Sequence, residues 1–238
     1  MRIRGRRTIS AGNFEDPFST CIGDLMAGLL SIFILALVYF ILNFTQARAQ
    51  LVENDVKLSQ MLTDIQFGMK SKGIEIKIDP SHGVLTLPEG VLFDVGEANL
   101  KTKGKIIINA LGEVLYKVLL LPEYKGSIET IFIEGHTDNV PIKTAKYPSN
   151  WELSTQRAIN TWLNLDKTHS NLNDLKNRKG QKLFSCSGYA DMRPVNSNTT
   201  QDGRKDNRRI AFRFSMTPPT TEDAKIIKTI KKSILPKS

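Results

Sequence analysis

Residues 128–138 read IETIFIEGHTD and carry the strongest fold signal in this chain. The first seven positions are apolar or β-branched apart from Glu129 and Glu134, and Gly135 then begins a polar run. Such a segment, closed by a glycine, predicts a buried strand over 128–134 that opens into a loop. Asp138 therefore follows the strand where it leaves the sheet, at a place where a loop carboxylate can meet solvent and a ligand.

Strand and helix patterns alternate on both sides of this strand. Further strands are expected over 74–78, 84–87, 183–188 and 209–214, with a turn at 79–83. Helices are expected over 102–120 and 151–165. This alternation predicts an α/β domain over 74–216, in which helices pack against a mixed sheet.

The spacing of apolar residues indicates which face of each helix is buried. In the first helix the inward residues are expected to be Ile106, Leu111, Val114, Leu115 and Val118. In the second helix they are expected to be Leu153, Ala158, Trp162 and Leu163.

A stretch near the N-terminus is long and apolar enough to cross a membrane. Between residues 18 and 44 the only charged side chain is Asp24, and about 20 residues are needed for a helix to span the hydrocarbon core. The run exceeds the apolar region of a signal peptide and no cleavage site of small residues follows, so a permanent transmembrane helix is expected over 18–44. The arm of residues 1–17 carries Arg2, Arg4, Arg6 and Arg7. This excess predicts a cytoplasmic N-terminus and an exported chain from residue 45 onward.

Asp24 lies one to two turns inside the cytoplasmic end of the expected span. A charged group in a membrane helix costs roughly 2.5–3.5 kcal/mol at mid-depth and less near the edge, so it usually has a function. The alternative is a first-turn acid that gains from the helix dipole. The residues alone leave both interpretations open.

Two further segments flank the expected domain. Residues 45–73 are expected to form an amphipathic linker helix that ends at Gly73, with an apolar stripe of Leu51, Leu58, Met61, Leu62, Ile65 and Met69. This stripe could cover the domain or pack on a second copy, and self-association is the favoured interpretation. The basic tail, residues 217–238, is expected to be a packed helix or a disordered segment.

Charge and cysteine content narrow the function classes. The net charge is +9, but no nucleic-acid-binding motif accompanies it, so direct nucleic-acid binding is not expected and an anionic wall polymer suits the basic face equally. Cys21 in the span and Cys186 outside cannot pair within one chain. Cys186 is either a buried small residue or an intermolecular bridge. Neither cysteine has metal-ligand spacing, and no metal or cofactor is expected.

Three polar motifs occur in order: GHTD at 135–138, NWELSTQRA at 150–158 and NRR at 207–209. They resemble the OmpA-like peptidoglycan-binding domain, in the wording of its MotB branch, over residues 84–215. The resemblance implies that Asp138 and Arg157 hold the ammonium and the carboxylate of diaminopimelate in peptidoglycan. It extends the site to Thr137, Asn150, Leu153, Arg208 and Arg209.

Several points of this site stay open at the level of sequence. Asp138 and Arg157 could instead pair with each other and fix the loop. One of Arg208 and Arg209 should point inward and pair with a carboxylate, either Asp94 or Asp138, and the sequence does not decide which arginine faces ligand. Phe93 and Asn99 could border the pocket. His136 has no serine or cysteine partner in the sequence pattern, so an enzyme is not expected.

The combination of one span, one membrane aspartate and a MotB-like domain resembles motor stator subunits. That resemblance implies that Asp24 translocates the ion and that two copies sit inside a pentameric MotA-like ring, held still by the wall. The short arm and the GDLMAG context of Asp24 resemble ZorB proteins of Zorya anti-phage systems. This implies a ZorA-type partner and a functional link to cytosolic nucleic-acid-acting effectors. A flagellar MotB-type subunit and a passive tether without ion flux are the alternatives, and proton versus sodium stays open.

Overall fold

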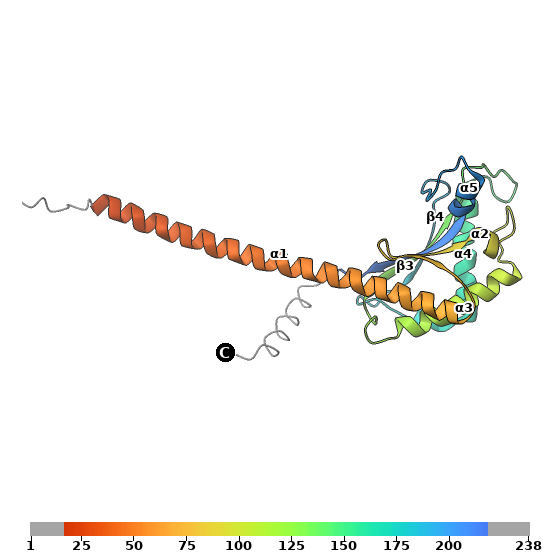
Figure 1. Cartoon of the computed structure of the whole chain (residues 1–238), viewed down its shortest axis with the longest axis horizontal. Helices are drawn as coiled ribbons and strands as arrows, with labels where there is room; N and C mark the ends of the chain where they lie inside the picture. The colour runs from red at the N-terminus through yellow and green to blue at the C-terminus, as the bar shows by residue number, and fades with distance from the viewer. Residues whose placement is uncertain (1–16, 219–238) are drawn as a thin grey trace, which may run out of the picture. The chain divides into compact units, whose positions relative to one another are not determined.

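The computed structural model describes residues 17–218 of the chain (Figure 1). The chain divides into two compact units, 1–48 and 49–238. Helix α1, Pro17–Ser71, begins in the first unit and ends in the second. The expected arm before Pro17 and the expected tail after Pro218 lie outside the described residues.

The first unit contributes the apolar part of α1. The segment Cys21–Thr45 has a mean hydropathy of 2.7 and none of it is buried within the chain. It is the one helix among residues 17–218 that is long and apolar enough to cross a membrane. Hydroxyl groups in it are satisfied locally, since Ser31 Oγ donates to the Ala27 carbonyl at 2.8 Å. The predicted N-terminal apolar helix is confirmed.

The second unit is built on a five-stranded mixed sheet in the order β1-β2-β5-β3-β4. The strands are β1 Lys77–Asp79, β2 Val84–Pro88, β3 Ile128–His136, β4 Phe184–Gly188 and β5 Arg209–Met216. Strands β3 and β4 are parallel and the other neighbours are antiparallel. The helices are α2 Glu89–Leu92, α3 Thr102–Leu119, α4 Asn150–Thr168 and α5 Gln201–Asn207, with a 3-10 helix at Ser170–Asp174. The predicted α/β fold with a mixed sheet is confirmed. The short helices α2 and α5 were not predicted, because one or two turns carry no periodicity.

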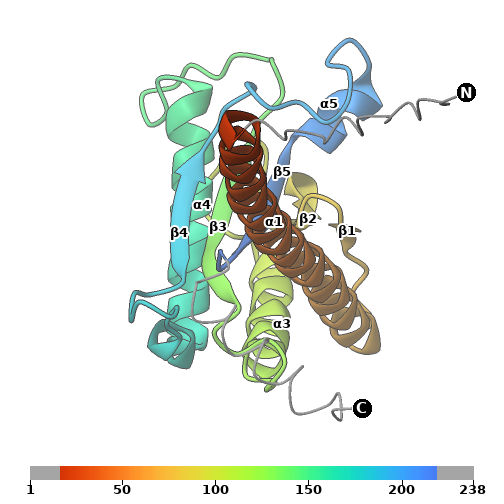
Figure 2. The same cartoon turned by 90° about the vertical axis from the view of Figure 1, so that its left-hand side faces the viewer.

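The core lies between the sheet and helices α3 and α4. Leu111 and Leu115 of α3 are fully buried with Ile133 of β3 and Phe212 of β5. Helix α4 packs on β3 and β4, the two parallel strands that it connects (Figure 2). Gly135 allows this close approach, because a Cβ there would lie 2.0 Å from the Ser154 carbonyl oxygen.

Two residues that were expected to face the core are exposed. Ile106 is 62% exposed and Leu163 is 55% exposed. Ile106 begins a run of three isoleucines, and packing selects Ile107 and Ile108 for the core instead. Next to Leu163, Trp162 packs against the core by stacking on Phe184, with ring centroids 4.7 Å apart. Neighbouring residues in a helix point about 100° apart, so a run of consecutive apolar residues does not show which of them faces the core.

The apolar stripe at the end of α1 belongs to the core of the second unit. Met61, Leu62, Ile65 and Met69 are at most 1% exposed and join the main hydrophobic cluster. Polar contacts support this docking: Asn54 donates to the Thr217 carbonyl at 3.1 Å and Gln66 to the Ile76 carbonyl at 3.1 Å. The favoured self-association through these residues is wrong, because the domain itself buries them. The predicted helix end is confirmed: Gly73 follows with φ +73°.

Cys186 lies in β4 and is partly buried. Its Sγ is 3.6 Å from the Ala158 carbonyl oxygen, and burial raises the pKa of the thiol to about 11. These contacts favour the small packed residue over the intermolecular bridge.

Candidate functional site

Asp138 sits directly after β3, as predicted, and its carboxylate is fixed from two sides. Oδ1 accepts from the Val140 amide at 3.0 Å, and Oδ2 lies 2.5 Å from Arg208 Nη1. The sheet brings these residues together, because His136 of β3 pairs with Arg209 at the start of β5. Asp138 and Arg208, which are 70 positions apart in the chain, therefore meet at one edge of the sheet.

Glu89 continues the chain of charges from Arg208 to Arg157. Its Oε2 lies 3.0 Å from Arg208 Nε, and its Oε1 lies 2.5 Å from Arg157 Nη2. Glu89 follows Pro88, which pairs with Arg209 across β2 and β5, and the Glu89 amide donates to the Arg208 carbonyl at 3.0 Å. The four side chains Arg157, Glu89, Arg208 and Asp138 alternate in charge, and we call them the charged quartet.

The quartet is mostly withdrawn from water. Arg157 is 2% exposed, while the Arg208 side chain is 36% exposed. Burial lowers the pKa of the Arg157 guanidinium and the charge of Glu89 opposes this shift. Arg157 Nε also donates to the Glu97 carbonyl at 2.8 Å, and its guanidinium lies 5.2 Å from the centre of the Phe93 ring. Arg157 is thus a buried anchor, and Arg208 is the arginine of the quartet that solvent reaches.

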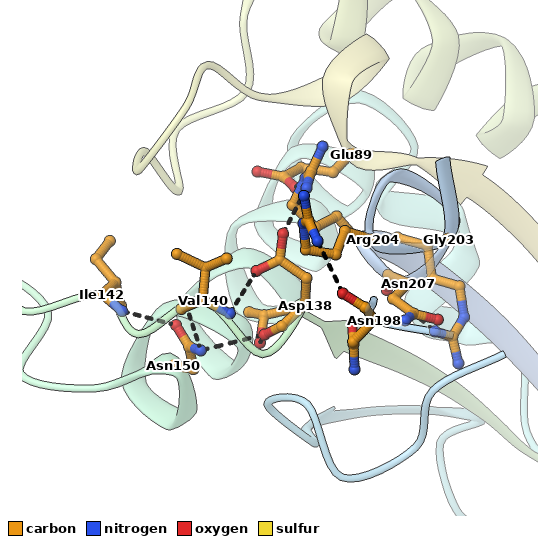
Figure 3. Close-up of polar contacts among 12 residues, drawn as sticks. Glu89, Asp138, Val140, Ile142, Asn150, Asn198, Gly203, Arg204 and Asn207 are labelled. Atoms are coloured by element: carbon orange, nitrogen blue, oxygen red, sulfur yellow. Dashed lines mark hydrogen bonds and ion pairs between the residues drawn. The ribbon is translucent and has the colours of Figure 1, made fainter. Parts of the chain in front are cut away.

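Asn150 holds the loop that carries Asp138 (Figure 3). Its Nδ2 donates to the Asp138 carbonyl at 3.3 Å and to the Val140 carbonyl at 3.0 Å, and its Oδ1 accepts from the Ile142 amide at 3.2 Å. Asn150 begins α4, which Ser149 caps by accepting from the Trp151 amide. The asparagine therefore couples the loop to the helix that carries Arg157.

Thr137 and Leu153 support the same loop from within. Thr137 is buried, with Oγ1 donating to the Asp138 carbonyl at 2.9 Å. Leu153 is buried in a small apolar cluster with Ala98 and Tyr147. Both expected site residues therefore shape the loop and expose little surface to a ligand.

Asn207 holds the loop before Arg208. It is fully buried, and its Oδ1 accepts from the Val195 and Asn196 amides at 2.8 and 2.9 Å. Its Nδ2 donates to the Asn198 side chain at 2.8 Å. The asparagine of the NRR motif thus fixes the backbone from which Arg208 reaches Asp138.

The structure shows how the two neighbouring arginines are paired within the domain. Arg208 pairs with Asp138, one of the two carboxylates expected, whereas Asp94 is exposed. Arg209 is the inward residue and donates to the Asn207 and Arg193 carbonyls at 3.0 and 3.1 Å. Burial lowers the pKa of Arg209 to about 10. The more exposed arginine holds the carboxylate, while the expectation assigned that pairing to the inward one.

Asp138 and Arg157 are brought into one network but not into direct contact. Asp138 pairs with Arg208 and Arg157 pairs with Glu89, so the alternative of a mutual Asp138–Arg157 salt bridge is wrong. Glu89 was missed from sequence. The available signal was one of charge: the three motifs contain three arginines but only two acids, Asp138 and Glu152, which calls for a further acid nearby.

A second charged cluster lies outside the quartet. Arg213 forms a bidentate pair with Glu134, with both N–O distances 2.9 Å, and Glu134 is 1% exposed. Burial would raise the pKa of Glu134, but His136 and Arg213 bring it down to about 2. His136 stacks on Tyr189, which lies under the Arg193 guanidinium. In this cluster a buried carboxylate of β3 pairs with a partly exposed arginine of β5.

Comparison with known proteins agrees with this architecture. Residues 92–208 match the OmpA family. Motility protein B of Bacillus subtilis (strain 168) is 32% identical over 158 residues, which cover 65% of this chain and 54% of that protein. The protein YtxE of the same strain is 34% identical over 161 residues, covering 66% of this chain and 58% of that protein.

A solved structure shares the fold. A MotB-like protein from Desulfovibrio vulgaris has a TM-score of 0.54 at 21% identity, covering 69% of this chain and 98% of that chain. This chain spans a little over half the length of the curated relatives that it matches. Residues 92–208 of this chain are therefore similar to the OmpA family, and the chain is similar in sequence to motility protein B over 65% of its length.

Proposed function

We propose that this chain anchors a membrane complex to the cell wall by binding the zwitterionic end of diaminopimelate in peptidoglycan. The observation that carries the proposal is the Asp138–Arg208 pair at the solvent side of the charged quartet. A ligand ammonium would donate to the Asp138 carboxylate, and the Arg208 guanidinium would donate to a ligand carboxylate, both in charge-assisted hydrogen bonds. Arg157, named first by the resemblance for the carboxylate, would support Arg208 from below through Glu89.

Binding of purified stem peptides to the full chain in detergent micelles tests this role. Wild type should bind a tripeptide that ends in diaminopimelate and should bind its lysine counterpart at least about tenfold more weakly, because lysine lacks the carboxylate. Asp138→Ala should abolish the binding. Asp174→Ala removes an exposed carboxylate elsewhere in the domain and serves as the control. Equal binding of both peptides would refute the clamp.

The apolar helix suggests the second half of the function. Asp24 is the one residue of the Asp, Glu, Lys and Arg types within Cys21–Thr45, about one turn from its start. We propose that Asp24 carries the permeant ion, that two copies of the chain form a dimer inside a MotA-like pentameric ring, and that the wall clamp holds this stator still. The proposed location is the inner membrane, with a cytoplasmic N-terminus and a periplasmic domain. The likeness to motility protein B supports this reading.

The machine that the stator serves is proposed to be a ZorB-type anti-phage system with a ZorA-type partner, on the resemblance around Asp24. A flagellar motor is the alternative, which the name of the Bacillus relative supports. Asp24→Asn and Asp138→Ala should each abolish phage protection in the first case and swimming in the second. If Asp24→Asn kept full phage protection and full swimming, the motor proposal would fail and the passive tether would remain as the interpretation.

A further inference from the structure

Glu89 holds two arginines together beneath the proposed ligand site. Its oxygens lie 2.5 Å from Arg157 Nη2 and 3.0 Å from Arg208 Nε. Its side chain is 8% exposed, so this carboxylate has exchanged water for two guanidinium groups. Buried charges are tolerated when each has a partner of opposite sign, and Glu89 is the partner of both arginines.

The charges of the quartet cancel. Arg157 and Arg208 contribute two positive charges, and Glu89 and Asp138 contribute two negative charges, so their sum is zero. A ligand end that carries one ammonium and one carboxylate leaves this sum unchanged. A bare carboxylate would add an uncompensated negative charge, and a bare ammonium would add a positive one.

We propose that Glu89 sets the ligand selectivity of this site: it cancels the charge of the second arginine, so that the site accepts a zwitterion in preference to a bare carboxylate. The inference rests on the proposed function. Without the carboxylate of Glu89, Arg157 and Arg208 would face Asp138 alone, and the sum would be +1. The ligand end that restores neutrality would then be a bare carboxylate.

The contacts of Arg208 fit this role. The Nη1 atom of Arg208 is paired with Asp138 and its Nε atom with Glu89. No partner of its Nη2 atom is found among residues 17–218. A ligand carboxylate can meet Nη2 while Glu89 keeps the guanidinium in place. Glu89 is thus a positioning residue, and its charge as well as its shape affects which ligand end the site prefers.

The test measures binding of three tripeptides, L-Ala-γ-D-Glu-X, to the full chain in detergent micelles. The third residue X is meso-diaminopimelate, lysine or 2-aminopimelate, whose side chains end in a zwitterion, a bare ammonium and a bare carboxylate. Wild type should prefer the zwitterion. In Glu89→Gln, which keeps the shape of the side chain, the preference for the zwitterion over the bare carboxylate should fall about tenfold.

Two further variants separate charge from structure. Glu89→Asp keeps the charge and should keep the preference even where all affinities fall. The double variant Glu89→Gln/Arg157→Met returns the sum to zero without a buried unpaired charge, and should regain the preference for the zwitterion. Asp94→Asn removes an exposed carboxylate and should leave the preference unchanged.

The outcomes are distinct. If Glu89→Gln weakens all three peptides in proportion, or if the double variant keeps the altered preference, Glu89 serves structure alone and the inference is overturned. If wild type binds none of the three peptides, the clamp itself is refuted, and Glu89 has no ligand to select.

Discussion

At the scale of single residues, the site depends on two arginines that share one carboxylate but lie in different surroundings. Arg157 is 2% exposed and is held by Glu89, the Glu97 carbonyl and the Phe93 ring. Arg208 shares Glu89 but keeps 36% of its side chain in contact with solvent. The same carboxylate thus pairs with one buried arginine and with one arginine that solvent reaches.

This difference predicts unequal stability costs. Arg157→Met leaves Glu89 buried with one partner fewer and should lower the free energy of unfolding by about 3–5 kcal/mol, as found when a buried pair loses one member. Arg208→Met should cost less, about 1–3 kcal/mol, because solvent reaches Arg208 although buried Asp138 and Glu89 each lose a partner. Urea unfolding followed by circular dichroism measures both. Equal losses would contradict the assignment of Arg157 as the buried anchor.

The Glu134–Arg213 pair predicts a dependence of stability on pH. The pKa of Glu134 lies at about 2 in the folded chain, below its ordinary value of 4.5. A lowered folded-state pKa stabilises the fold fully above about pH 4.5, and the stability is lost as the pH falls from there toward 2, with an upper limit of about 3 kcal/mol. Urea midpoints at pH 7 and pH 3 should differ less in Glu134→Gln than in wild type. If the difference between the two midpoints were the same in Glu134→Gln and in wild type, Glu134 would not contribute to the loss of stability in acid.

At the scale of elements, the last turns of α1 act as a core helix of the domain. Met61, Leu62 and Ile65 are buried under the sheet, whereas Val56 on the same helix is 60% exposed. Sequence periodicity marked this stripe as apolar, but periodicity is the same whether the partner is a sheet or a second copy. Only the folded domain, whose surface this helix covers, shows that the partner of the stripe is the domain.

The docking of α1 predicts a sharp contrast between two substitutions. Leu62→Ala removes a fully buried side chain and should cost about 2–5 kcal/mol of unfolding free energy. Val56→Ala should change stability by about 0.5 kcal/mol or less, because its side chain is exposed. Thermal unfolding of both variants in detergent checks this. A loss at Val56 as large as at Leu62 would show that the stripe is packed elsewhere.

At the scale of the whole molecule, the folded unit begins earlier than the motifs suggest. The second unit starts at Ala49, while the strand pattern placed the domain boundary at residue 74. Residues 49–71 supply part of the core, so the helix that continues from the apolar segment is also a structural part of the folded domain.

Truncation tests this boundary. A fragment of residues 49–218 should be soluble and unfold cooperatively, because it keeps the buried stripe of α1. A fragment of residues 74–218 should expose the apolar surface that Met61, Leu62, Ile65 and Met69 cover, and should aggregate or lose cooperative unfolding. Circular dichroism melts and size-exclusion chromatography separate these outcomes. A cooperative fold in the shorter fragment would place α1 outside the core.

The sequence by itself determined the apolar helix, the strand that ends at the GHTD motif, and the place of Asp138 directly after that strand. These features follow from local composition, from the periods of helix and strand, and from motif spacing, which need no knowledge of the fold. The sequence did not determine which face of α3 is buried, since three consecutive isoleucines fit more than one helix face.

The tertiary structure alone decided how the charges are connected. Glu89 stands between Arg157 and Arg208 because β2 pairs with β5, which places Pro88 opposite Arg209, and β5 pairs with β3, which places Arg209 opposite His136. Strand register is fixed by contacts between distant segments, and no local pattern encodes it. The partners of the two arginines therefore became known only once the sheet had assembled.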